Sequence, residues 1–403
     1  MRRDSSGFEG VMDLSSPEPS LSAFKPDLRV SMVAAERSGD MLAALLLQGM
    51  RKTWPLLRAS GIVGPQMDAT GFVSRWSCDE LSVRGLVEAL WRYRHINGIR
   101  KALIQDLLAS PPDLFVGVDA SDFNLPVERL LRQKGVPTVQ LVCPSIWAWR
   151  PERVQKIRDS VDHVLCIYPF EPDLLAQHGI EGSFVGHPIA DVIPLEPDRL
   201  KTRFQLGLPA DATIVALLPG SRPSEAKALA LPFLQAAQLM RQHRPELKFV
   251  LPTHELLMPV IDAAVAQTGM QSHVKVVMDR SHEVQAACDV ALVASGTATL
   301  ETALHKRPMV IAYKMQWLSW QIANRQRLLP WVGLPNILCN ERLVPEFLQE
   351  QVQPKALAQA VMGWLDDPDA VTRIQERFTD LHHQLRQDMP TLATHAIQKV
   401  LAA

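Results

Sequence analysis

The feature of this sequence that most constrains its fold is the regular alternation of short apolar segments with helical patterns. The apolar segments lie at residues 28–34, 114–118, 138–142, 163–167, 213–218, 248–251, 274–277, 290–294 and 309–312. They are almost continuously apolar and contain many of the residues that favour strands. Strands of this kind, separated by helices, are typical of parallel sheets that are covered on both faces. The sequence therefore predicts an α/β fold.

The alternation occurs twice, which indicates two Rossmann-like, doubly wound domains in series. It restarts after Gly186-His187-Pro188, and the proline-bearing stretch 188–197 is typical of a linker. The expected divisions are a leader over residues 1–27, an N-terminal domain over 28–188, a second domain over 189–368 and C-terminal helices over 369–403.

The two ends of the chain depart from this alternation. Residues 1–27 are polar and rich in serine, proline and acids, which predicts a disordered leader. The chain after Gln353 has only helical patterns. We expect helices over 355–365 and 370–402, with the last one packing back on the first domain.

Composition narrows the classes of function. The chain has 403 residues, 47% of them apolar, and a formal net charge of −1, which argues against a general nucleic-acid binder. No apolar run approaches the ~18 residues that span a bilayer, so we expect no transmembrane segment. The five cysteines form no CxxC pair, which favours no structural zinc, and Cys143, Cys166 and Cys288 lie in or beside apolar runs, which favours buried free thiols. The five are Cys78, Cys143, Cys166, Cys288 and Cys339.

The first candidate anion site follows the first predicted strand of the second domain. Gly220 allows the backbone to approach a ligand, and Pro223 suits the first position of a helix. Ser221 and Arg222 add a hydroxyl and a guanidinium to the amides of that helix N-terminus, which favours an anion. The alternative is an ordinary turn between a strand and a helix, with a surface arginine.

A second turn of the same kind follows the strand predicted over 290–294. Ser295 and Thr297 are able to cap the next helix, and Gly296 leaves room for a diphosphate. Glu301 lies one helical turn after Thr297, where a carboxylate is placed to accept hydrogen bonds from ribose hydroxyls. The alternative is a capped helix with a solvated glutamate. Two such turns in one domain favour a nucleoside-diphosphate site.

In the first domain, two acids follow the strand predicted over 114–118. Asp119 adjoins the apolar run, so desolvation would raise the pKa of its carboxyl toward a value useful for a general base. Asp122 suits the N-terminal cap of the helix that begins near Phe123. The alternative makes both acids caps or turn residues.

Two segments interleave aromatic and basic residues, and one further motif imitates a metal site. Residues 86–101 and 315–331 have the character of amphipathic stretches that fit an anionic membrane surface. The alternative is aromatic side chains in the core with solvated arginines.

Asp367-Pro368-Asp369 resembles a metal-binding DxD motif, but its place between two helical patterns favours a turn with a helix cap. The histidines show no metal-ligand spacing, so we expect no metal.

In their order along the chain, these motifs resemble those of the lipid-A-disaccharide synthases, a family of GT-B glycosyltransferases. The resemblance covers about residue 30 to the C-terminus, and the segments PSIWAWR (144–150) and SGTATLE (295–301) are its most specific parts. Other matching segments are Glu36 with Ser38-Gly39-Asp40, Gly117-Val118-Asp119-Ala120, Gly186-His187-Pro188, Pro219-Gly220-Ser221-Arg222, Leu334-Pro335-Asn336 and Leu343-Val344-Pro345-Glu346.

The resemblance implies an inverting transfer between two acylated sugars. The donor would be UDP-2,3-diacylglucosamine and the acceptor 2,3-diacylglucosamine 1-phosphate (lipid X). The products would be the β-1,6-linked lipid A disaccharide 1-phosphate and UDP. The resemblance also implies two domains that face a central cleft, no cofactor, and a cytoplasmic enzyme peripheral to the inner membrane.

The same resemblance assigns roles to residues. Asp119 would deprotonate the acceptor 6-hydroxyl, which attacks the anomeric carbon of the donor in one displacement. Glu301 would bind the ribose, Asn336 would shape the donor pocket, and the remaining donor residues would hold the diphosphate in place of a metal. The donor-binding residues are Gly220, Ser221, Arg222, Ser295, Gly296, Thr297, Glu301 and Asn336.

The expected acceptor site departs from the family pattern. The family has glycine at Ala35 and Val63, where this chain adds bulk near the expected path of the acceptor. The chain also has two extra cations there, Arg37 and Arg84. We hypothesise that they grip the acceptor phosphate or change the acyl specificity. The acceptor-binding residues would be Glu36, Arg37, Ser38, Gly39, Asp40 and Arg84.

Two other functions remain open at this point. Another GT-B enzyme that uses UDP-N-acetylglucosamine, such as an epimerase or a peptidoglycan transferase, shares the donor features but does not explain PSIWAWR. A catalytically silent relative that binds UDP-sugar or lipid would explain the altered first loop. The presence of Asp119, Arg222 and Glu301 together argues against the silent relative.

Overall fold

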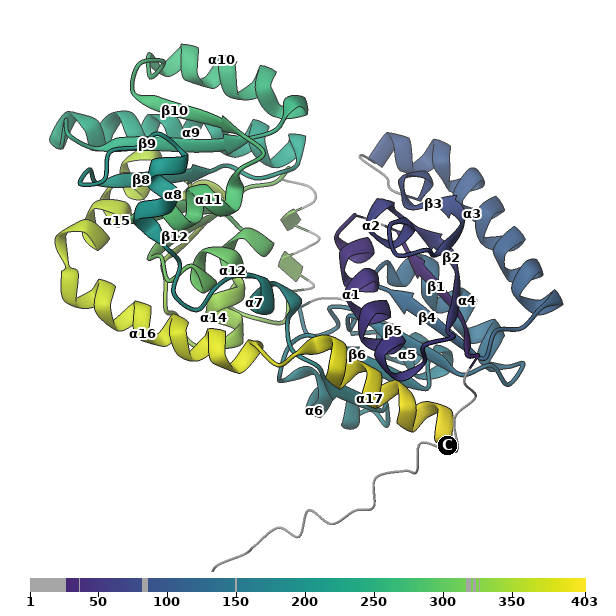
Figure 1. The fold of residues 1–403 in the computed structure, drawn as a ribbon. Helices are drawn as coiled ribbons and strands as arrows, with labels where there is room; N and C mark the ends of the chain where they lie inside the picture. Colours follow the sequence, from purple (N-terminus) through teal and green to yellow (C-terminus); the bar gives the residue numbers. More distant parts are fainter. Residues whose placement is uncertain are drawn as a thin grey trace, which may run out of the picture.

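Two parallel sheets, each between layers of helices, form the two halves of the chain (Figure 1). The computed structural model describes residues 27–35, 37–81, 86–148, 151–316, 320–321, 324–325 and 327–403. Strand pairing is parallel throughout both sheets in this described part of the chain. The predicted α/β fold of two doubly wound halves is therefore confirmed. The predicted leader lies, but for Asp27, outside the described residues.

The first sheet has the strand order β3–β2–β1–β4–β5–β6–β7. Its strands are β1 (Arg29–Ala34), β2 (Arg58–Val63), β3 (Val73–Ser77), β4 (Leu114–Val118), β5 (Thr138–Leu141), β6 (His163–Cys166) and β7 (Gly182–Phe184). Its helices are α1 (Arg37–Thr53), α2 (Pro65–Asp68), α3 (Leu86–Ala109), α4 (Ser121–Arg132), α5 (Arg153–Ser160) and α6 (Glu171–Ala176). α1 packs on one face of the sheet, and α3, α4 and α5 pack on the other.

The second sheet has the order β10–β9–β8–β11–β12–β13. Its strands are β8 (Ile214–Leu218), β9 (Lys248–Thr253), β10 (Val274–Met278), β11 (Val290–Ala294), β12 (Met309–Tyr313) and β13 (Glu346–Leu348). The helices of this half are α7 (Pro188–Val192), α8 (Arg199–Gln205), α9 (Pro223–His243), α10 (Met258–Thr268), α11 (Ser281–Ala287), α12 (Thr297–Leu304), α14 (Leu334–Leu338) and α15 (Pro354–Asp366).

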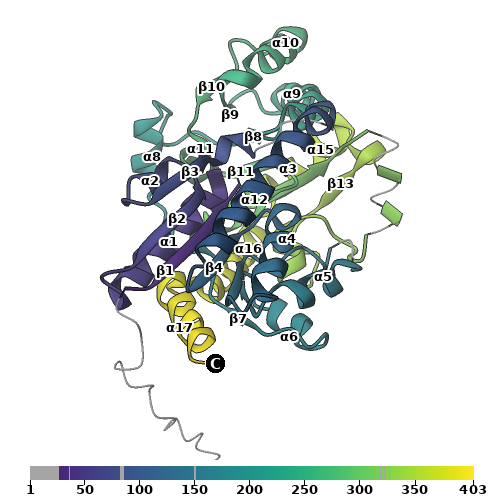
Figure 2. The same cartoon turned by 90° about the vertical axis from the view of Figure 1, so that its right-hand side faces the viewer.

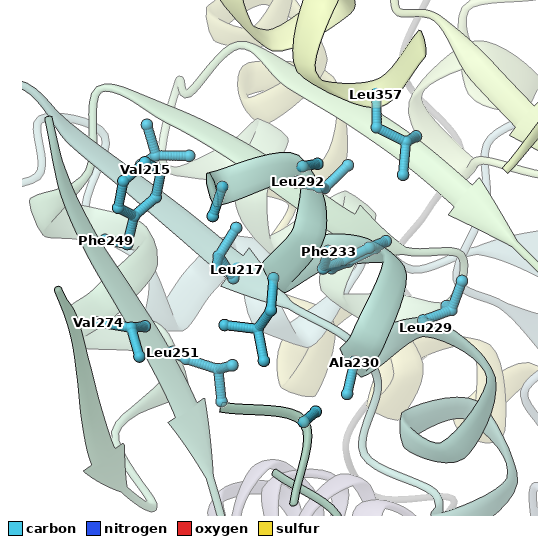
Figure 3. Close-up of a cluster of buried hydrophobic side chains, with 14 of the residues drawn as sticks. Val215, Leu217, Leu229, Ala230, Phe233, Phe249, Leu251, Val274, Leu292 and Leu357 are labelled. Atoms are coloured by element: carbon cyan, nitrogen blue, oxygen red, sulfur yellow. The ribbon is translucent and has the colours of Figure 1, made fainter. Parts of the chain in front are cut away.

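The core of the second half shows why its strands are apolar throughout. On one face, Leu217 and Leu251 of the sheet meet Phe233 of α9 and Leu357 of α15, all of them buried (Figure 3). On the other face, the strands pack on α11, α12 and the C-terminal helix α16 (Pro368–Leu385). Because neither face meets water, successive residues of each strand are buried, and the alternation of apolar and polar residues is lost.

Four strands at or near the sheet edges were not predicted, whereas the edge strand β10 was. β2 is interrupted by Ser60 and Gly61, and β3 is an edge strand whose residues are mostly exposed. β7 and β13 have only three residues each. An edge strand has one partner and little burial, so it needs no apolar run, and its sequence gives a weak signal.

The predicted C-terminal helix over 370–402 is two helices rather than one. α16 packs on α12 of the second half, and α17 (Met389–Ala402) packs on α1 of the first half (Figures 1 and 2). Between them, Asp388 has φ 52°, a left-handed conformation that interrupts a right-handed helix. The return of the last helix to the first half is confirmed.

The chain crosses between the halves twice, and the two crossings lie side by side. The backbone amide of His187, on the first crossing, donates to the carbonyl of Leu385, on the second, at 2.8 Å. Gly186 has φ 88°, and a Cβ there would lie 2.6 Å from Cβ of Gln387. The motif Gly186-His187-Pro188 thus needs its glycine for both conformation and close approach.

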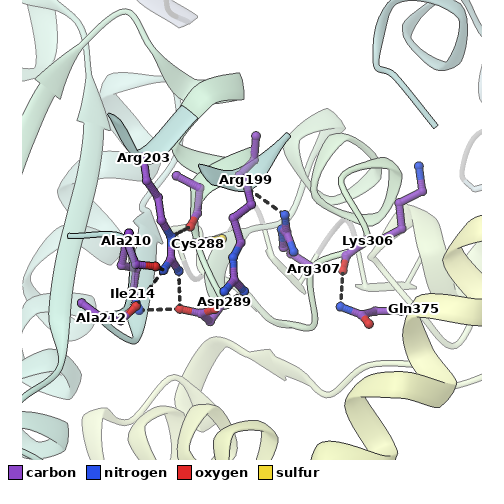
Figure 4. Close-up of polar contacts among 12 residues, drawn as sticks. Arg199, Arg203, Ala210, Ala212, Ile214, Cys288, Asp289, Lys306, Arg307 and Gln375 are labelled. Atoms are coloured by element: carbon purple, nitrogen blue, oxygen red, sulfur yellow. Dashed lines mark hydrogen bonds and ion pairs between the residues drawn. The ribbon is translucent and has the colours of Figure 1, made fainter. Parts of the chain in front are cut away.

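A buried arginine attaches α8 to the second sheet. Arg203 is 1% exposed and donates to Asp289 at 2.7 Å and to the carbonyl of Ala287 at 2.9 Å (Figure 4). Asp289 also accepts from the amide of Ile214 at 2.7 Å and pairs with Arg199 at 2.6 Å. The starts of β8 and β11 are thereby joined, since the buried charges are paired and hydrogen-bonded.

The described residues offer neither a membrane span nor a metal cluster. None of the described helices is long and apolar enough to cross a bilayer. No group of three or more His, Cys, Asp or Glu side chains among them is able to hold a metal ion. Asp367 instead caps α16, accepting from the amide of Ala370 at 2.9 Å, as predicted. The predicted buried thiols at Cys143, Cys166 and Cys288 are confirmed.

Gly49 of α1 gives a test of how closely α17 docks. A Cβ at Gly49 would lie 2.5 Å from the carbonyl oxygen of Pro390 in α17. We therefore expect Gly49→Ala to lower the free energy of unfolding by about 1–3 kcal/mol and to lower Tm. Gly98→Ala in α3 is the matched control, because a Cβ there meets no atom within 4 Å and alanine favours a helix. Equal Tm values for the two variants would contradict this packing.

Candidate active site

The two glycine-bearing turns of the second half lie next to each other. β8 and β11 are adjacent parallel strands, with Leu218 of β8 opposite Val293 of β11. Gly220 therefore follows β8 at the same edge of the sheet at which Ser295 follows β11. The carboxyl edge of a parallel sheet is where ligands of doubly wound folds bind.

The turn at Gly220 is closed by Glu225, which the sequence analysis did not select. Gly220 has φ 111°, and a Cβ there would lie 2.5 Å from Cβ of Glu225. The amides of Ser221 and Arg222 donate to the Glu225 carboxylate at 3.2 and 3.3 Å. The Arg222 side chain is 76% exposed. An anion that used these amides would displace Glu225, whereas the Arg222 guanidinium lies 3.6 Å from that carboxylate and remains largely exposed to a ligand.

The turn after β11 is open, and its helix cap differs from the prediction. Gly296 is exposed, and a Cβ there would meet no atom within 4 Å. The predicted caps at Ser295 and Thr297 are wrong, because Gly296 is the N-cap residue and Thr297 is already in α12. Ser295 remains in the strand ladder, and its hydroxyl donates to the carbonyl of Val332 at 2.8 Å. The exposed Gly296 and Thr297 leave the helix N-terminus accessible.

Glu301 lies one turn into α12 and is held by neighbours from α11. Its carboxylate accepts from Nε2 of Gln285 at 3.0 Å and lies 4.0 Å from Nδ1 of His282. Its side chain is 17% exposed. The carboxylate therefore retains acceptor capacity toward a ligand, while Gln285 fixes its direction.

Asn336 is fully buried and is satisfied by the protein itself. It donates to the carbonyl of Val344 and to Glu346 at 2.9 and 2.8 Å, and accepts from the Val344 amide at 3.0 Å. Glu346 also accepts from the amides of Val332 and Gly333, both at 2.9 Å. Asn336 therefore supports the loop beside Ser295 and presents no free polar atom to a ligand. The sequence placed Glu346 in a motif but did not predict this role for it.

Asp119 follows β4 at the carboxyl edge of the first sheet. It has φ 52° and is followed by Ala120 with φ 40°, so two successive residues are left-handed. Its carbonyl accepts from Nδ2 of Asn124 at 3.0 Å and from Nε2 of Gln140 at 2.9 Å. Although the residue surface is open to solvent, the protein around the carboxyl desolvates it and raises its pKa, against a hydrogen bond from Ala120. These are properties of a general base.

Asp122 is not the helix cap that the sequence predicted. The N-cap residue of α4 is Ala120, and no side chain caps the helix. Asp122 instead pairs with the Arg153 guanidinium through both carboxylate oxygens, at 2.7 and 2.8 Å. The left-handed residues at 119 and 120 start the helix earlier than the pattern indicated. Asp122 then lies inside the first turn, pointing outward.

The predicted acceptor residues are described only in part. Glu36 and Arg84 lie outside the described residues, and so do the side chains of Arg37 and Ser38. Asp40 is 1% exposed and points inward, where it accepts from the amides of residues 64, 66 and 67.

Gly39 lies where α1 approaches the end of β4. A Cβ at Gly39 would lie 3.6 Å from the carbonyl of Val118. The two departures that add bulk, Ala35 and Val63, are buried in the core of the first half. Their extra carbon atoms therefore contact apolar core residues, and not the acceptor as the sequence had suggested.

An aromatic group links the first half to the second. Trp147 packs edge-on against Tyr168 and Phe170, with ring centroids 5.9 and 5.3 Å apart. Its Nε1 donates to the buried carboxyl of Glu171 at 2.9 Å. Tyr168 belongs to the buried cluster of the second half, and His187 on the crossing lies against it. Trp147, from the PSIWAWR segment, is therefore part of the junction between the halves.

The two aromatic and basic segments are also described in part. In α3, Ile99 and Leu103 face the core, while Tyr93 is 63% exposed and Arg94 and Lys101 are exposed. The side chains of residues 86–92 lie outside the described part. In the second segment, residues 317–319, 322–323 and 326 are not described.

The chain is similar to known proteins along most of its length. A family model described as lipid-A-disaccharide synthetase matches residues 30–400. The lipid-A-disaccharide synthase of Albidiferax ferrireducens is 56% identical over 379 residues, which are 93% of this chain and 97% of that protein. The lipid-A-disaccharide synthase of Verminephrobacter eiseniae is 53% identical over 385 residues, 94% and 99% of the two chains.

A solved glycosyltransferase shares the fold. The crystal structure of the glycotransferase of kitacinnamycin matches with a TM-score of 0.63 at 16% identity, covering 92% of this chain and 98% of that one. At this identity the likeness concerns the fold alone. The two parallel sheets are thus arranged as in GT-B glycosyltransferases, as the sequence predicted.

Glu171 gives a pH-dependent test of the junction. Burial raises its pKa from 4.5 to about 8. The folded chain then binds this proton more tightly than the unfolded chain. The stabilising contribution is complete below the unfolded pKa and is lost as the pH rises through the folded one. We expect the Tm of the wild type to fall, relative to that of Glu171→Gln, between about pH 5 and about pH 8.

Scanning calorimetry across this pH range measures the effect. Asp173→Asn is the control, since Asp173 is an exposed carboxylate on the same helix. Parallel Tm curves for the wild type and Glu171→Gln would show that Glu171 does not titrate in this range.

Proposed function

Because this chain belongs to the lipid-A-disaccharide synthetase family, we propose that it joins UDP-2,3-diacylglucosamine to 2,3-diacylglucosamine 1-phosphate (lipid X). The products are the β-1,6-linked lipid A disaccharide 1-phosphate and UDP. The observation that carries this proposal is Asp119, held at a strand end in a left-handed turn with a raised pKa. Such a carboxylate suits removal of a proton from a sugar hydroxyl.

We propose that the second half binds the donor. The Arg222 guanidinium and the accessible N-terminus of α12, with Gly296 and Thr297, hold the diphosphate and stabilise the charge of departing UDP. Glu301, one turn further along α12, accepts from the ribose. Gly220 and Ser221 contribute once the diphosphate has displaced Glu225.

Asn336 and Ser295 support the donor site from behind. Both act on the loop at 332–336, because Ser295 bonds the carbonyl of Val332 and Asn336 shares Glu346 with the amides of that loop. Their proposed role is therefore to shape the donor pocket through the loop, without a hydrogen bond from Asn336 to the sugar nucleotide.

In the proposed reaction, Asp119 takes the proton of the acceptor 6-hydroxyl as its oxygen attacks the anomeric carbon of the donor. The bond between that carbon and the diphosphate oxygen breaks, and UDP leaves with the bonding electrons. A single displacement inverts the configuration. No metal is needed in this proposal, because cationic and dipolar groups of the protein stabilise the leaving group.

We propose that the acceptor lies along the start of α1, with its phosphate near Arg37 and Arg84. Glu36, Ser38 and Gly39 are further proposed acceptor residues, whereas Asp40 acts by fixing the adjoining loop at 64–67. The proposed acceptor domain spans residues 28–188 and the donor domain 189–368, followed by the helices of 369–403. The first sheet ends at Phe184 and the second begins at Ile214.

We propose peripheral contact of α3 with the anionic surface of the inner membrane. Its outward side carries Tyr93, Arg94 and Lys101, while Ile99 and Leu103 face the core. Basic side chains beside an exposed aromatic ring favour a negatively charged lipid surface. The acylated substrates reside in such a surface, so this contact brings the acceptor site to them.

Release of UDP by the purified full chain tests the reaction. With UDP-2,3-diacylglucosamine, we expect release that depends on lipid X and falls by at least about 100-fold in Asp119→Asn, because the base is lost. Asp122→Asn is the matched control. It removes the same charge from a residue that lies three positions after Asp119 and whose carboxylate pairs with Arg153. UDP affinity, measured by calorimetry, should be equal in all three proteins.

Each rival function predicts a different result. UDP binding without any release in the wild type would indicate the silent relative. Isomerisation of UDP-N-acetylglucosamine without a lipid acceptor would indicate an epimerase. Equal losses of kcat in Asp119→Asn and Asp122→Asn would remove Asp119 from the role of base.

Cosedimentation with vesicles tests the membrane contact. We expect the pair Arg94→Glu and Lys101→Glu to lower affinity for phosphatidylglycerol-containing vesicles by about tenfold or more, since each cation contributes about 1 kcal/mol. The control pair Arg129→Glu and Lys134→Glu makes the same change in charge at exposed positions of α4 and the loop after it. Equal weakening by both pairs would argue against a specific role of α3.

A further inference from the structure

Three fully buried polar side chains lie directly behind Asp119. Asn124 and Glu128 come from α4 and Gln140 comes from β5, and each is 0% exposed. Gly117 of β4 leaves the space that they occupy. A Cβ there would lie 2.2 Å from Oε1 of Glu128 and 2.6 Å from Oε1 of Gln140, so both oxygens face the same space beside Gly117.

The side-chain amides of Gln140 and Asn124 bond to backbone carbonyls of residues that have left-handed conformations or lie beside them. Nε2 of Gln140 donates to the carbonyl of Asp119 at 2.9 Å and lies 3.4 Å from that of Val142. Nδ2 of Asn124 donates to the carbonyl of Asp119 at 3.0 Å and of Val33 at 3.3 Å. Asp119 and Val142 have φ 52° and 76°, conformations that are unfavourable for residues other than glycine and persist only when surrounding contacts enforce them.

The oxygen atoms of the same trio lack donors. Both carboxyl oxygens of Glu128, Oε1 of Gln140 and Oδ1 of Asn124 are buried without a hydrogen-bond partner in the described part of the chain. An ionised Glu128 would face the Gln140 oxygen as one acceptor against another, which is costly in the interior. Burial raises the pKa of Glu128 well above its ordinary value, and the nearby Gly117 amide opposes that shift. A proton on Glu128 supplies the missing donor.

We propose that Glu128 is a positioning residue, which acts as a neutral acid and donates a hydrogen bond to Oε1 of Gln140. That bond fixes the orientation of the Gln140 amide, since reversing the amide would place its NH2 group toward Glu128 and its oxygen toward the carbonyl of Asp119. The fixed amide holds Asp119 in the turn from which its carboxylate reaches the acceptor. The inference rests on the proposed role of Asp119 as the base.

Two substitutions of Glu128 separate positioning from mere filling of the core. Glu128→Gln keeps a neutral donor toward Gln140, so we expect it to retain most of the wild-type kcat. Glu128→Leu fills similar space without a donor, and we expect kcat to fall by about 100-fold, because a small displacement of a reacting group has this effect. The affinity for UDP should be unchanged in both variants. A residue that only fills the core would tolerate leucine at least as well as glutamine.

Gln140→Leu provides a second, independent variant. It removes the amide on the Asp119 carbonyl, so we expect a loss of kcat similar to that of Glu128→Leu. If both side chains act through one bond, the double variant should lose little more than either single variant. Should Glu128→Leu fail to fold, low kcat in Gln140→Leu with high kcat in Glu128→Gln still supports the proposal.

The infrared absorption of the free protein gives a readout that needs no activity. At neutral pH, the difference between the wild type and Glu128→Gln should contain the carbonyl band of a protonated carboxylic acid. This band tests Glu128 even if the wild type fails to transfer sugar, in which case the proposed function alone fails. The inference is overturned if the band is absent, if Glu128→Leu keeps the wild-type kcat, or if Glu128→Gln loses as much as Glu128→Leu.

Discussion

Parallel pairing in register is the constraint on which both candidate sites depend. It makes neighbouring strands end at one edge, so that residues far apart in sequence follow adjacent strands. β8 and β11 bring Gly220 and Ser295 together in this way, and β4 and β5 bring Asp119 next to Val142. The hydrogen bonds of the ladder are satisfied within the sheet, and the first residues beyond it must find other partners. The chemistry of the protein is concentrated at these positions.

Most carboxylates near these edges serve the backbone, and few are left for a substrate. Asp40, Glu225 and Glu346 each accept hydrogen bonds from backbone amides of a turn, which satisfies amides that have no partner in a strand or helix. Asp119 and Glu301 differ from these acids. The Asp119 carboxyl accepts from the amide of the next residue, Ala120, and the Glu301 carboxylate accepts from the Gln285 side chain and lies near His282. An acid that supports a turn is therefore distinguished from one that is available to a substrate by the hydrogen bonds that its carboxylate oxygens already accept from the protein.

The sequence predicted the central strands, the two halves and the edge of each sheet that carries the motifs, because buried parallel strands leave a continuous apolar pattern. The sequence did not predict the roles of several polar side chains beside the turns. Ser295 was predicted as a cap, yet the ladder extends one residue further and directs its hydroxyl to another loop. Asp122 was predicted as a cap, yet two left-handed residues begin the helix earlier. The role of Glu128 depends on Gln140, which is distant in sequence, whereas Glu225 bonds amides only three and four residues before it and could have been found from that spacing.

The distance between base and donor site depends on the crossings as well as on the sheets. α16 is packed on the second half and α17 on the first, so the chain between Leu385 and Met389 belongs to neither. The first crossing is bonded to it through His187. Because Tyr168 of the first half packs in the buried cluster of the second, the separation of Asp119 and Arg222 is set by this shared junction together with the two crossings. The left-handed Gly186 and Asp388 are the positions at which the chain turns from one half toward the other.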